Sequence, residues 1–146
     1  MVNLIIKQPY RKFINNDFVL KVAAFCLEYL SASTTDLTIS ITGDQDIRKL
    51  NKQFRKVDSP TDVLSFPSDE IDPQTNRRYV GDIVISFQRA KEQALDFNHS
   101  VMKEISILII HGILHLFQYD HESQDEAKKM FSLQDEIMNE LEIPNL

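Results

Sequence analysis

The sequence has one cysteine, three glycines, five prolines and no tryptophan among its 146 residues. The single cysteine, Cys26, excludes an internal disulfide, and its mostly apolar neighbours in the segment 22–30 predict a buried core residue. The scarcity of glycine and proline excludes a collagen-like chain and argues against a disordered one. We therefore expect one globular domain over residues 1–146, a usual length for a single hydrophobic core.

Long apolar runs are also absent. The richest run, Ile105 to Phe117, is shorter than the roughly 20 residues that span a bilayer, and it contains two histidines. The first residues, MVNLIIK, lack the basic region and the small-residue cleavage motif of a secretory signal. Together with the lone cysteine, these features predict a cytoplasmic protein without a membrane partner.

Acidic side chains outnumber basic ones, and the formal net charge is −6. The excess belongs to the C-terminal segment, because residues 120–146 carry eight acidic and two basic side chains, whereas residues 1–119 carry 14 of each. Within the balanced part lies a basic cluster made of Arg48, Lys49, Lys52, Arg55 and Lys56. On charge alone, this cluster is either a solvated helix surface or a face for a nucleic-acid partner.

Apolar periodicity predicts an α+β fold, in which a small mixed β-sheet packs against helices. Alternating or β-branched segments predict strands over residues 4–6, 37–42, 61–66 and 82–86. Helical spacing predicts helices over residues 18–30, 45–54, 88–95 and 101–117, and a capping box at 123–126 precedes a last helix that extends to 141. We expect Asp44 to cap the second helix. The polar segment 67–81 is expected to be a loop, either a binding lid or a tolerated insertion.

The segment HGILHLFQYDH, residues 111–121, contains three of the four histidines. On an ideal helix, Glu104, His111, His115 and Gln118 lie within an arc of about 60°, and most of the remaining positions are apolar. An unpaired buried imidazole would cost roughly 1–3 kcal/mol. This polar stripe must therefore face hydrogen-bonding partners, a water-filled cleft or a metal ion.

A separation of four residues places His111 and His115 on one side of a helix, within reach of a single ion. With His121, the spacing equals that of the metzincin zinc site, H-E-x-x-H-x-x-G-x-x-H. This predicts one Zn²⁺ ion per chain on a metzincin-like zinc helix, with a hydrogen-bonded histidine cluster as the alternative. Two positions depart from the metzincin pattern, since Gly112 replaces the glutamate base and Gln118 replaces the turn glycine. Gly112 either leaves room beside the metal or allows close helix packing.

Three protein ligands leave the fourth coordination position of zinc open, which is typical of a catalytic site. Hydrolysis is then the leading hypothesis, because the ion can activate water and polarise an oxygen of the substrate. The alternative is a non-catalytic, zinc-stabilised binding module, in which Asp120, Asp62 or Glu104 supplies the fourth ligand.

The histidine segment resembles the signature of the bacterial YbeY family, HGxLHLxGYDH. Two further segments are similar to signatures of that family: NKQFR at 51–55 followed by SPTDVLSFP at 59–67, and GDIVIS at 81–86. The three segments occur in order over residues 51–121, and Gln118 at the family's glycine is the one clear departure.

The resemblance implies a single-strand-specific, metal-dependent endoribonuclease that acts in rRNA maturation, at the 3′ end of 16S rRNA, and in ribosome quality control. It also implies that His111, His115 and His121 bind the metal and that Arg55 is the active-site arginine, for which a phosphodiester is a suitable partner. The expected partners are single-stranded RNA, ribosomal RNA and ribosomal proteins. A metallopeptidase-like hydrolase, disfavoured by Gly112, and a non-catalytic ribosome-associated binding factor are the alternatives.

Two further groups of residues are expected to contact the RNA. Backbone contacts are assigned to Lys49, Lys52, Lys56, Arg77 and Arg78. Phe54, Phe66 and Tyr79 are candidates for stacking on bases, but for the two phenylalanines core packing is the favoured interpretation.

Overall fold

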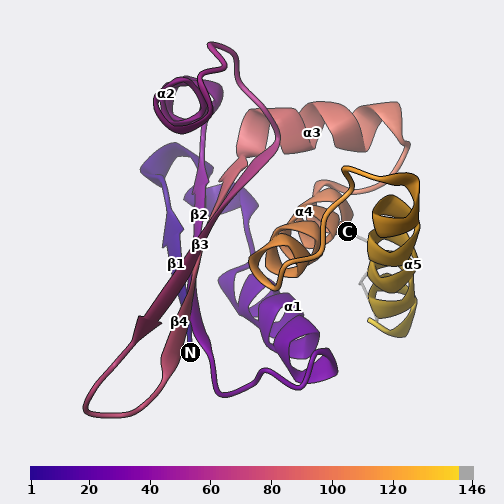
Figure 1. Ribbon diagram of the computed structural model, residues 1–146. Coiled ribbons are helices and arrows are strands. Elements are labelled where there is room, and N and C mark those ends of the chain that lie inside the picture. Colours follow the sequence, from indigo (N-terminus) through magenta and orange to yellow (C-terminus); the bar gives the residue numbers. More distant parts are fainter. Residues whose placement is uncertain (142–146) are drawn as a thin grey trace.

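The computed structural model describes residues 1–141, and at its centre is a mixed sheet of four strands (Figure 1). The strands are β1 (Val2–Ile6), β2 (Asp36–Thr42), β3 (Val63–Ile71) and β4 (Arg78–Ser86), in the order β1-β2-β4-β3 across the sheet. β2 is parallel to both β1 and β4, whereas β3 is antiparallel to β4 and forms one edge. The predicted mixed sheet is confirmed.

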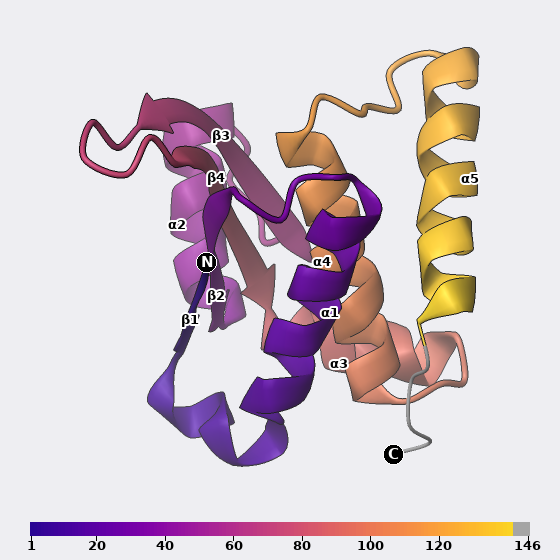
Figure 2. The ribbon, with the colours of Figure 1, turned by 90° about the horizontal axis from the view of Figure 1, so that it is seen from below.

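The helices are the 3-10 helix η1 (Gln8–Phe13) and the α-helices α1 (Asn16–Tyr29), α2 (Asp44–Arg55), α3 (Phe87–Asp96), α4 (Val101–Leu116) and α5 (Gln124–Glu140). Helices α1 and α4 lie on one face of the sheet, α2 lies on the other, and α5 packs outside α4 (Figures 1 and 2). The five α-helices agree with the predicted ones, and the α+β class is confirmed. Within residues 1–141, no helix combines the length and the apolar character that crossing a membrane requires.

The main core lies between the sheet and α4. Strand β2 alternates buried Leu37, Ile39 and Ile41 with half-exposed polar residues, so its apolar side chains point to one face. Helix α4 lies between the sheet, α1 and α5, which explains why it is apolar on nearly every side. Full burial of one such side chain stabilises the fold by roughly 1.5–3 kcal/mol. Helix α4 is therefore a rigid support for the few polar residues that it carries.

A smaller cluster holds α2 against the opposite face of the sheet. It consists of Ile47 from α2 with Leu64 and Val84, and the partly buried Leu50 and Phe66 pack against it. Leu64 and Val84 are paired directly across β3 and β4, so their side chains share one face. This packing fixes the C-terminal end of α2 beside the edge strand β3.

The start of α2 differs from the prediction. The residue at the N-cap is Gly43, which has no side-chain cap, and Asp44 is the first residue of the helix. The Asp44 carboxylate instead accepts a hydrogen bond from the Ser86 hydroxyl (2.6 Å), and the Asp44 N–H donates to Gln88 Oε1 (2.7 Å). The prediction that Asp44 caps this helix is therefore wrong, because a side chain of α3 satisfies the free backbone group.

The expected loop over residues 67–81 is also wrong. β3 continues to Ile71 and β4 begins at Arg78, so most of this segment forms an antiparallel hairpin. A turn closed by the hydrogen bonds from Asp72 N to Arg77 O (2.9 Å) and from Asn76 N to Asp72 O (2.8 Å) joins the strands. Polar residues and Pro67 conceal these strand extensions in the sequence, since an edge strand tolerates both.

Candidate active site

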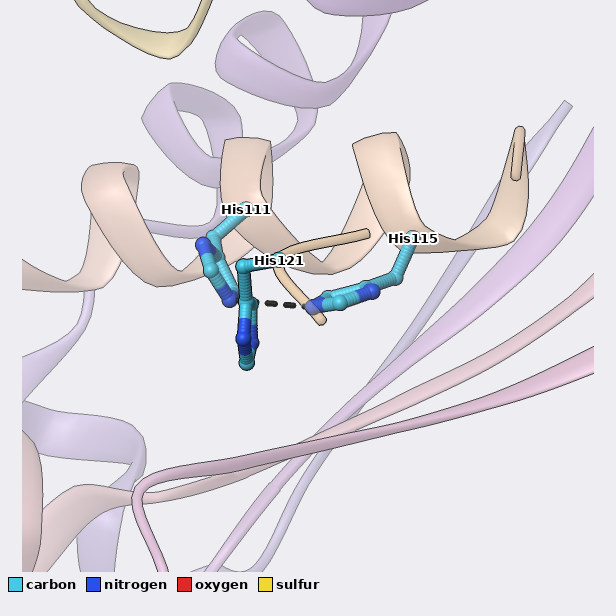
Figure 3. A group of neighbouring side chains, drawn as sticks. All are labelled: His111, His115 and His121. Atoms are coloured by element: carbon cyan, nitrogen blue, oxygen red, sulfur yellow. Dashed lines mark hydrogen bonds between the residues drawn. The ribbon is translucent and has the colours of Figure 1, made fainter. Parts of the chain in front are cut away.

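The three histidines converge beside the C-terminal end of α4. His111 and His115 project from the same side of the helix, one turn apart, and His121 reaches the same point from the segment that follows (Figure 3). The Nε2 atoms of His111 and His115 are 3.2 Å apart, and one ring nitrogen from each of the three residues lies within 4.8 Å of the others. The arrangement follows from the spacing: i and i+4 share a helix face, and the turn after α4 returns the chain.

This donor set fits a metal ion. Two nitrogens that are each about 2.0–2.1 Å from a tetrahedral zinc ion lie about 3.3 Å apart, close to the observed 3.2 Å. Three neutral imidazoles are ligands that zinc and other borderline divalent ions prefer. The three histidines could therefore hold a metal ion. Their geometry is compatible with zinc and with other borderline divalent ions.

The protonation states of His111 and His115 suit metal coordination. Desolvation lowers the pKa of both His111 and His115 from the usual 6.5, and for His115 the charge of the neighbouring His111 lowers it further. Both rings are therefore mostly neutral at pH 7, the form in which an imidazole nitrogen has a lone pair for a metal.

Gln134 of α5 fixes the orientation of His111. Nδ1–H of His111 donates to Gln134 Oε1 (2.9 Å), which leaves Nε2 as the nitrogen that faces His115 and His121. A hydrogen bond of this kind sets the tautomer and the ring angle of a histidine ligand. Sequence reasoning did not assign this role, although Gln134 is a polar residue in the apolar stripe of the last helix.

Gly112 serves the packing of α4 on the sheet. A Cβ atom at this position would lie 2.8 Å from Cγ2 of Ile83 in β4, so the glycine allows the helix to approach the strand closely. The hydroxyl of Ser65 donates to the Gly112 carbonyl (3.1 Å) and links β3 to the same turn of the helix. Of the two roles open for Gly112, the structure therefore supports close packing.

The turn that carries His121 is left-handed at Gln118. Gln118 has φ 75°, its N–H donates to His115 O, and the N–H of Tyr119 donates to Leu114 O (both 3.0 Å). These two hydrogen bonds form a Schellman motif. The motif ends α4 and directs the chain back toward His111 and His115 of the same helix. The left-handed backbone that the glycine of the metzincin pattern suggests is thus present, with glutamine in place of glycine.

A cleft of about 910 Å³ lies in front of the histidines. One wall is the C-terminal end of α2 with Phe54 and Arg55. The start of β3 and the two residues before it contribute residues between 61 and 67, and the far side is formed by His111, His115 and the segment 118–122. Arg55 is exposed, and among residues 1–141 it has no ion pair, whereas Arg48 and Lys52 both approach Asp58. Arg55 is therefore the free guanidinium of this cleft.

Comparison with known proteins identifies the family. A family model described as Endoribonuclease YbeY matches residues 6–142. The chain belongs to the YbeY family. Endoribonuclease YbeY of Persephonella marina is 45% identical over 139 residues, covering 94% of this chain and 91% of the relative. The protein of the same name from Aquifex aeolicus is 41% identical over 139 residues, with the same coverage of 94% and 91%.

A solved structure agrees with this membership. The solution structure of a Thermotoga maritima protein aligns with a TM-score of 0.62 at 30% sequence identity, covering 96% of this chain and 88% of that one. The YbeY fold therefore extends over nearly the whole chain.

The structure separates the predicted RNA-binding cations into two groups. Lys49, Lys52 and Lys56 are exposed on α2 or directly after it, on the element that carries Arg55. Arg77 donates to Asp36 (2.8 Å), Arg78 donates to Asp69 (3.4 Å), and neither lines the cleft. The role of all five in RNA binding stays a prediction.

None of the three acidic candidates for a fourth ligand belongs to the converging group among the described residues. Glu104 is buried and pairs with Nε2 of His99 (2.5 Å). Asp120 accepts the backbone N–H of His121 (2.7 Å), and Asp62 accepts the N–H of Val63 (2.7 Å) and the amide of Gln93 (3.2 Å). An ion held by the three histidines would keep a position open toward the cleft.

Proposed function

We propose that this protein is a zinc-dependent, single-strand-specific endoribonuclease that acts in the cytoplasm on ribosomal RNA, at the 3′ end of 16S rRNA, and in ribosome quality control. Cleavage of RNA and a role in rRNA processing follow from membership of the YbeY family. One observation carries the assignment to this cleft. Three imidazoles converge in it, no carboxylate among the described residues belongs to their group, and the unpaired Arg55 lines the same cleft.

In this proposal His111, His115 and His121 hold the ion. A bound zinc ion would supply Lewis acidity toward a phosphoryl oxygen or a water molecule. The chain contributes the rest. Gln134 keeps His111 in the ligating tautomer, and burial keeps His111 and His115 neutral. Arg55 binds the phosphodiester with two parallel N–H donors and offsets the negative charge that gathers on its oxygens as the bond to the leaving group breaks.

Lysines near Arg55 provide a path for the RNA backbone toward the cleft. Lys49, Lys52 and Lys56 contribute positive charge along α2, which attracts phosphates without reading base sequence. The opposite side of the cleft carries Asp120 and Glu122. The strand is therefore expected to enter along α2 and to meet the histidines from that side.

The alternatives are not favoured. A peptidase of the metzincin type needs the glutamate that Gly112 replaces, and the backbone of Gly112 packs tightly against Ile83. A closed, non-catalytic zinc site needs a fourth protein ligand, and among the described residues none of Glu104, Asp62 and Asp120 belongs to the converging group.

The test is a ribonuclease assay on purified protein whose metal content is measured by elemental analysis. We expect chelation to abolish cleavage of single-stranded RNA and zinc to restore it. Arg55→Ala should lower kcat/KM by roughly 100-fold or more, because a donor aimed at developing charge is removed. His111→Ala should lose both zinc and activity.

The control is Arg11→Ala, which removes an arginine from η1, outside the cleft, and should cleave at the wild-type rate. Circular dichroism verifies that every variant is folded. Folded His111→Ala and Arg55→Ala proteins that cleave RNA as fast as wild type would refute the proposal.

A further inference from the structure

Phe54 is an exposed aromatic side chain in the wall of the cleft. It leaves 58% of its surface exposed, it lines the cleft, and the next residue in the chain is Arg55. A single exposed phenyl ring is common on a protein surface, so what points to a ligand is the place of Phe54 in the cleft beside Arg55. The packing of α2 does not need Phe54, since Ile47 and Leu50 supply the contacts with the sheet.

The ring of Phe54 is nevertheless held in place. It meets Phe66 of β3 edge to face, with centroids 5.2 Å apart and an interplanar angle of 66°. Phe66 in turn packs against the cluster of Ile47, Leu64 and Val84 and lines the same cleft. This support orients Phe54 in advance, so a flat ligand that stacks on it loses little conformational entropy.

We propose that Phe54 is a stacking platform for one unpaired base of the RNA, adjacent to the phosphate that Arg55 binds. The inference rests on the proposed function and extends it to the way in which the substrate is held. A ring and a guanidinium on consecutive residues of one helix end match a base and its neighbouring phosphate, and aromatic stacking accepts any base. A base inside a duplex already stacks on its neighbours, so this platform selects single strands.

Another aromatic residue near the histidines does not offer the same surface. Phe131 of α5 is 44% exposed, but its ring lies against His111 and His121, with interplanar angles of 30° and 21°. It covers the ligands themselves. Phe54 combines a free ring, a supporting neighbour and an adjacent unpaired cation.

The direct test uses Phe54→Trp, which introduces the only tryptophan of the chain. A short single-stranded oligoadenosine, added at low salt with a chelator to prevent cleavage, should quench the tryptophan fluorescence, because a base stacks on the indole. An abasic oligonucleotide of equal length carries the same phosphates and should quench little. Equal quenching by both oligonucleotides, or quenching by neither, would overturn the inference.

A second measurement compares Phe54→Leu with the matched control Phe97→Leu, because Phe97 is 68% exposed and lies outside the cleft. Phe54→Leu should weaken oligoadenosine binding roughly tenfold while the dependence of log K on log salt keeps its slope, since the ring carries no charge. Phe97→Leu should bind as wild type. Wild-type binding by Phe54→Leu would overturn the inference.

The two proposals fail separately. A wild-type protein that cleaves no RNA with zinc present refutes the proposed function, whatever the fluorescence shows. A wild-type protein that cleaves RNA, together with a Phe54→Leu protein whose KM is unchanged, refutes the stacking platform alone. A higher KM with kcat nearly unchanged supports the platform.

Discussion

Gln118 is a non-glycine residue in a backbone conformation that favours glycine. Its φ of 75° lies in the left-handed region, where a Cβ atom costs roughly 1–2 kcal/mol. The Schellman motif that ends α4 requires this conformation, and the same turn brings His121 to the other histidines. The protein therefore carries local strain next to its candidate metal centre.

Replacement of Gln118 by glycine should relieve that strain. We expect Gln118→Gly to raise the free energy of unfolding by about 0.5–1 kcal/mol, because the gain in the folded state exceeds the added entropy of the unfolded chain. Thermal unfolding monitored by circular dichroism provides the measurement. The matched control is Gln53→Gly, at an exposed position of α2 with right-handed helical backbone. This variant should lower the free energy of unfolding by about 1 kcal/mol. A lower melting temperature for Gln118→Gly would contradict the strain.

Single residues also show what the sequence could reveal of the site. The convergence of His111 and His115 was predictable because both lie on one helix, where spacing alone fixes their relation. The partner of His111 was not, because Gln134 lies 23 residues further along on another helix. Its only signal in the sequence is a polar side chain where an apolar one fits. The exposure of Phe54 was equally hidden, since it depends on how α2 meets β3.

Helix α5 packs on the core and also supplies a hydrogen-bond partner to the histidine cluster. Its buried Met130 and Ile137 hold it against the rest of the fold, and this places Gln134 at the edge of the histidine cluster. The orientation of His111, a candidate metal ligand on α4, thus depends on a second element, although α5 supplies no histidine of this group itself.

Removing this contact should weaken metal binding while leaving the fold intact. We expect Gln134→Leu to lower the zinc affinity by roughly 10–100-fold, because His111 loses the acceptor that fixes its tautomer and ring angle. Competition with a chromogenic chelator measures the affinity. Gln53→Leu, an exposed site on α2, is the control and should bind zinc as wild type. Unchanged affinity in Gln134→Leu would show that the bond to Nδ1 is dispensable.

The elements themselves were predicted where their periodicity is strong. Strand β2 alternates apolar and polar residues, and helix α4 is a long apolar segment whose few polar residues follow helical spacing; both were found where expected. The β3–β4 hairpin was missed because β3 is an edge strand whose second half has no buried residue, so this half lacks an apolar pattern. The cap of α2 was missed because the group that satisfies Asp44 N–H belongs to Gln88, which only the tertiary fold brings near.

At the scale of the whole molecule, ion pairs tie the sheet together at its margins. Asp36 at the start of β2 accepts the N-terminal ammonium (2.6 Å) and the Arg77 guanidinium (2.8 Å), so it links β1, β2 and the hairpin. These two partners hold the pKa of Asp36 below its usual 3.8, with the hydrogen bond from Arg77 as the largest cause. The pKa of Asp46 is also lowered, first by the hydrogen bond from Thr42 and then by the hydrogen bond from Lys7.

These carboxylates make the stability of the fold sensitive to acid. A carboxylate whose pKa is lower in the folded than in the unfolded state stabilises the fold above the unfolded pKa, and this contribution is lost as the pH falls through the folded value. We therefore expect wild type to keep the contribution of Asp36 at pH 7 and pH 5 and to lose it below about pH 4. Asp36→Asn should be less stable than wild type at pH 7, and the difference should vanish at low pH.

Urea unfolding at several pH values measures both proteins. The control is Asp135→Asn, because Asp135 is exposed on α5 and forms no hydrogen bond or ion pair with the residues that the structure describes. Its stability should track that of wild type at every pH. A constant gap between wild type and Asp36→Asn down to the lowest pH would show that the Asp36 contacts are not electrostatic in origin.

Strand β3 lies at the border of the cleft and is also an edge strand of the sheet. An uncovered edge invites strands of other molecules to add to it and start aggregates. Three features oppose such growth: the proline at position 67, the irregular register between Pro67 and Glu70, and the charges of Asp69 and Glu70. The margin of the sheet can thus stay open to a nucleic acid strand while remaining a poor template for amyloid-like polymerisation.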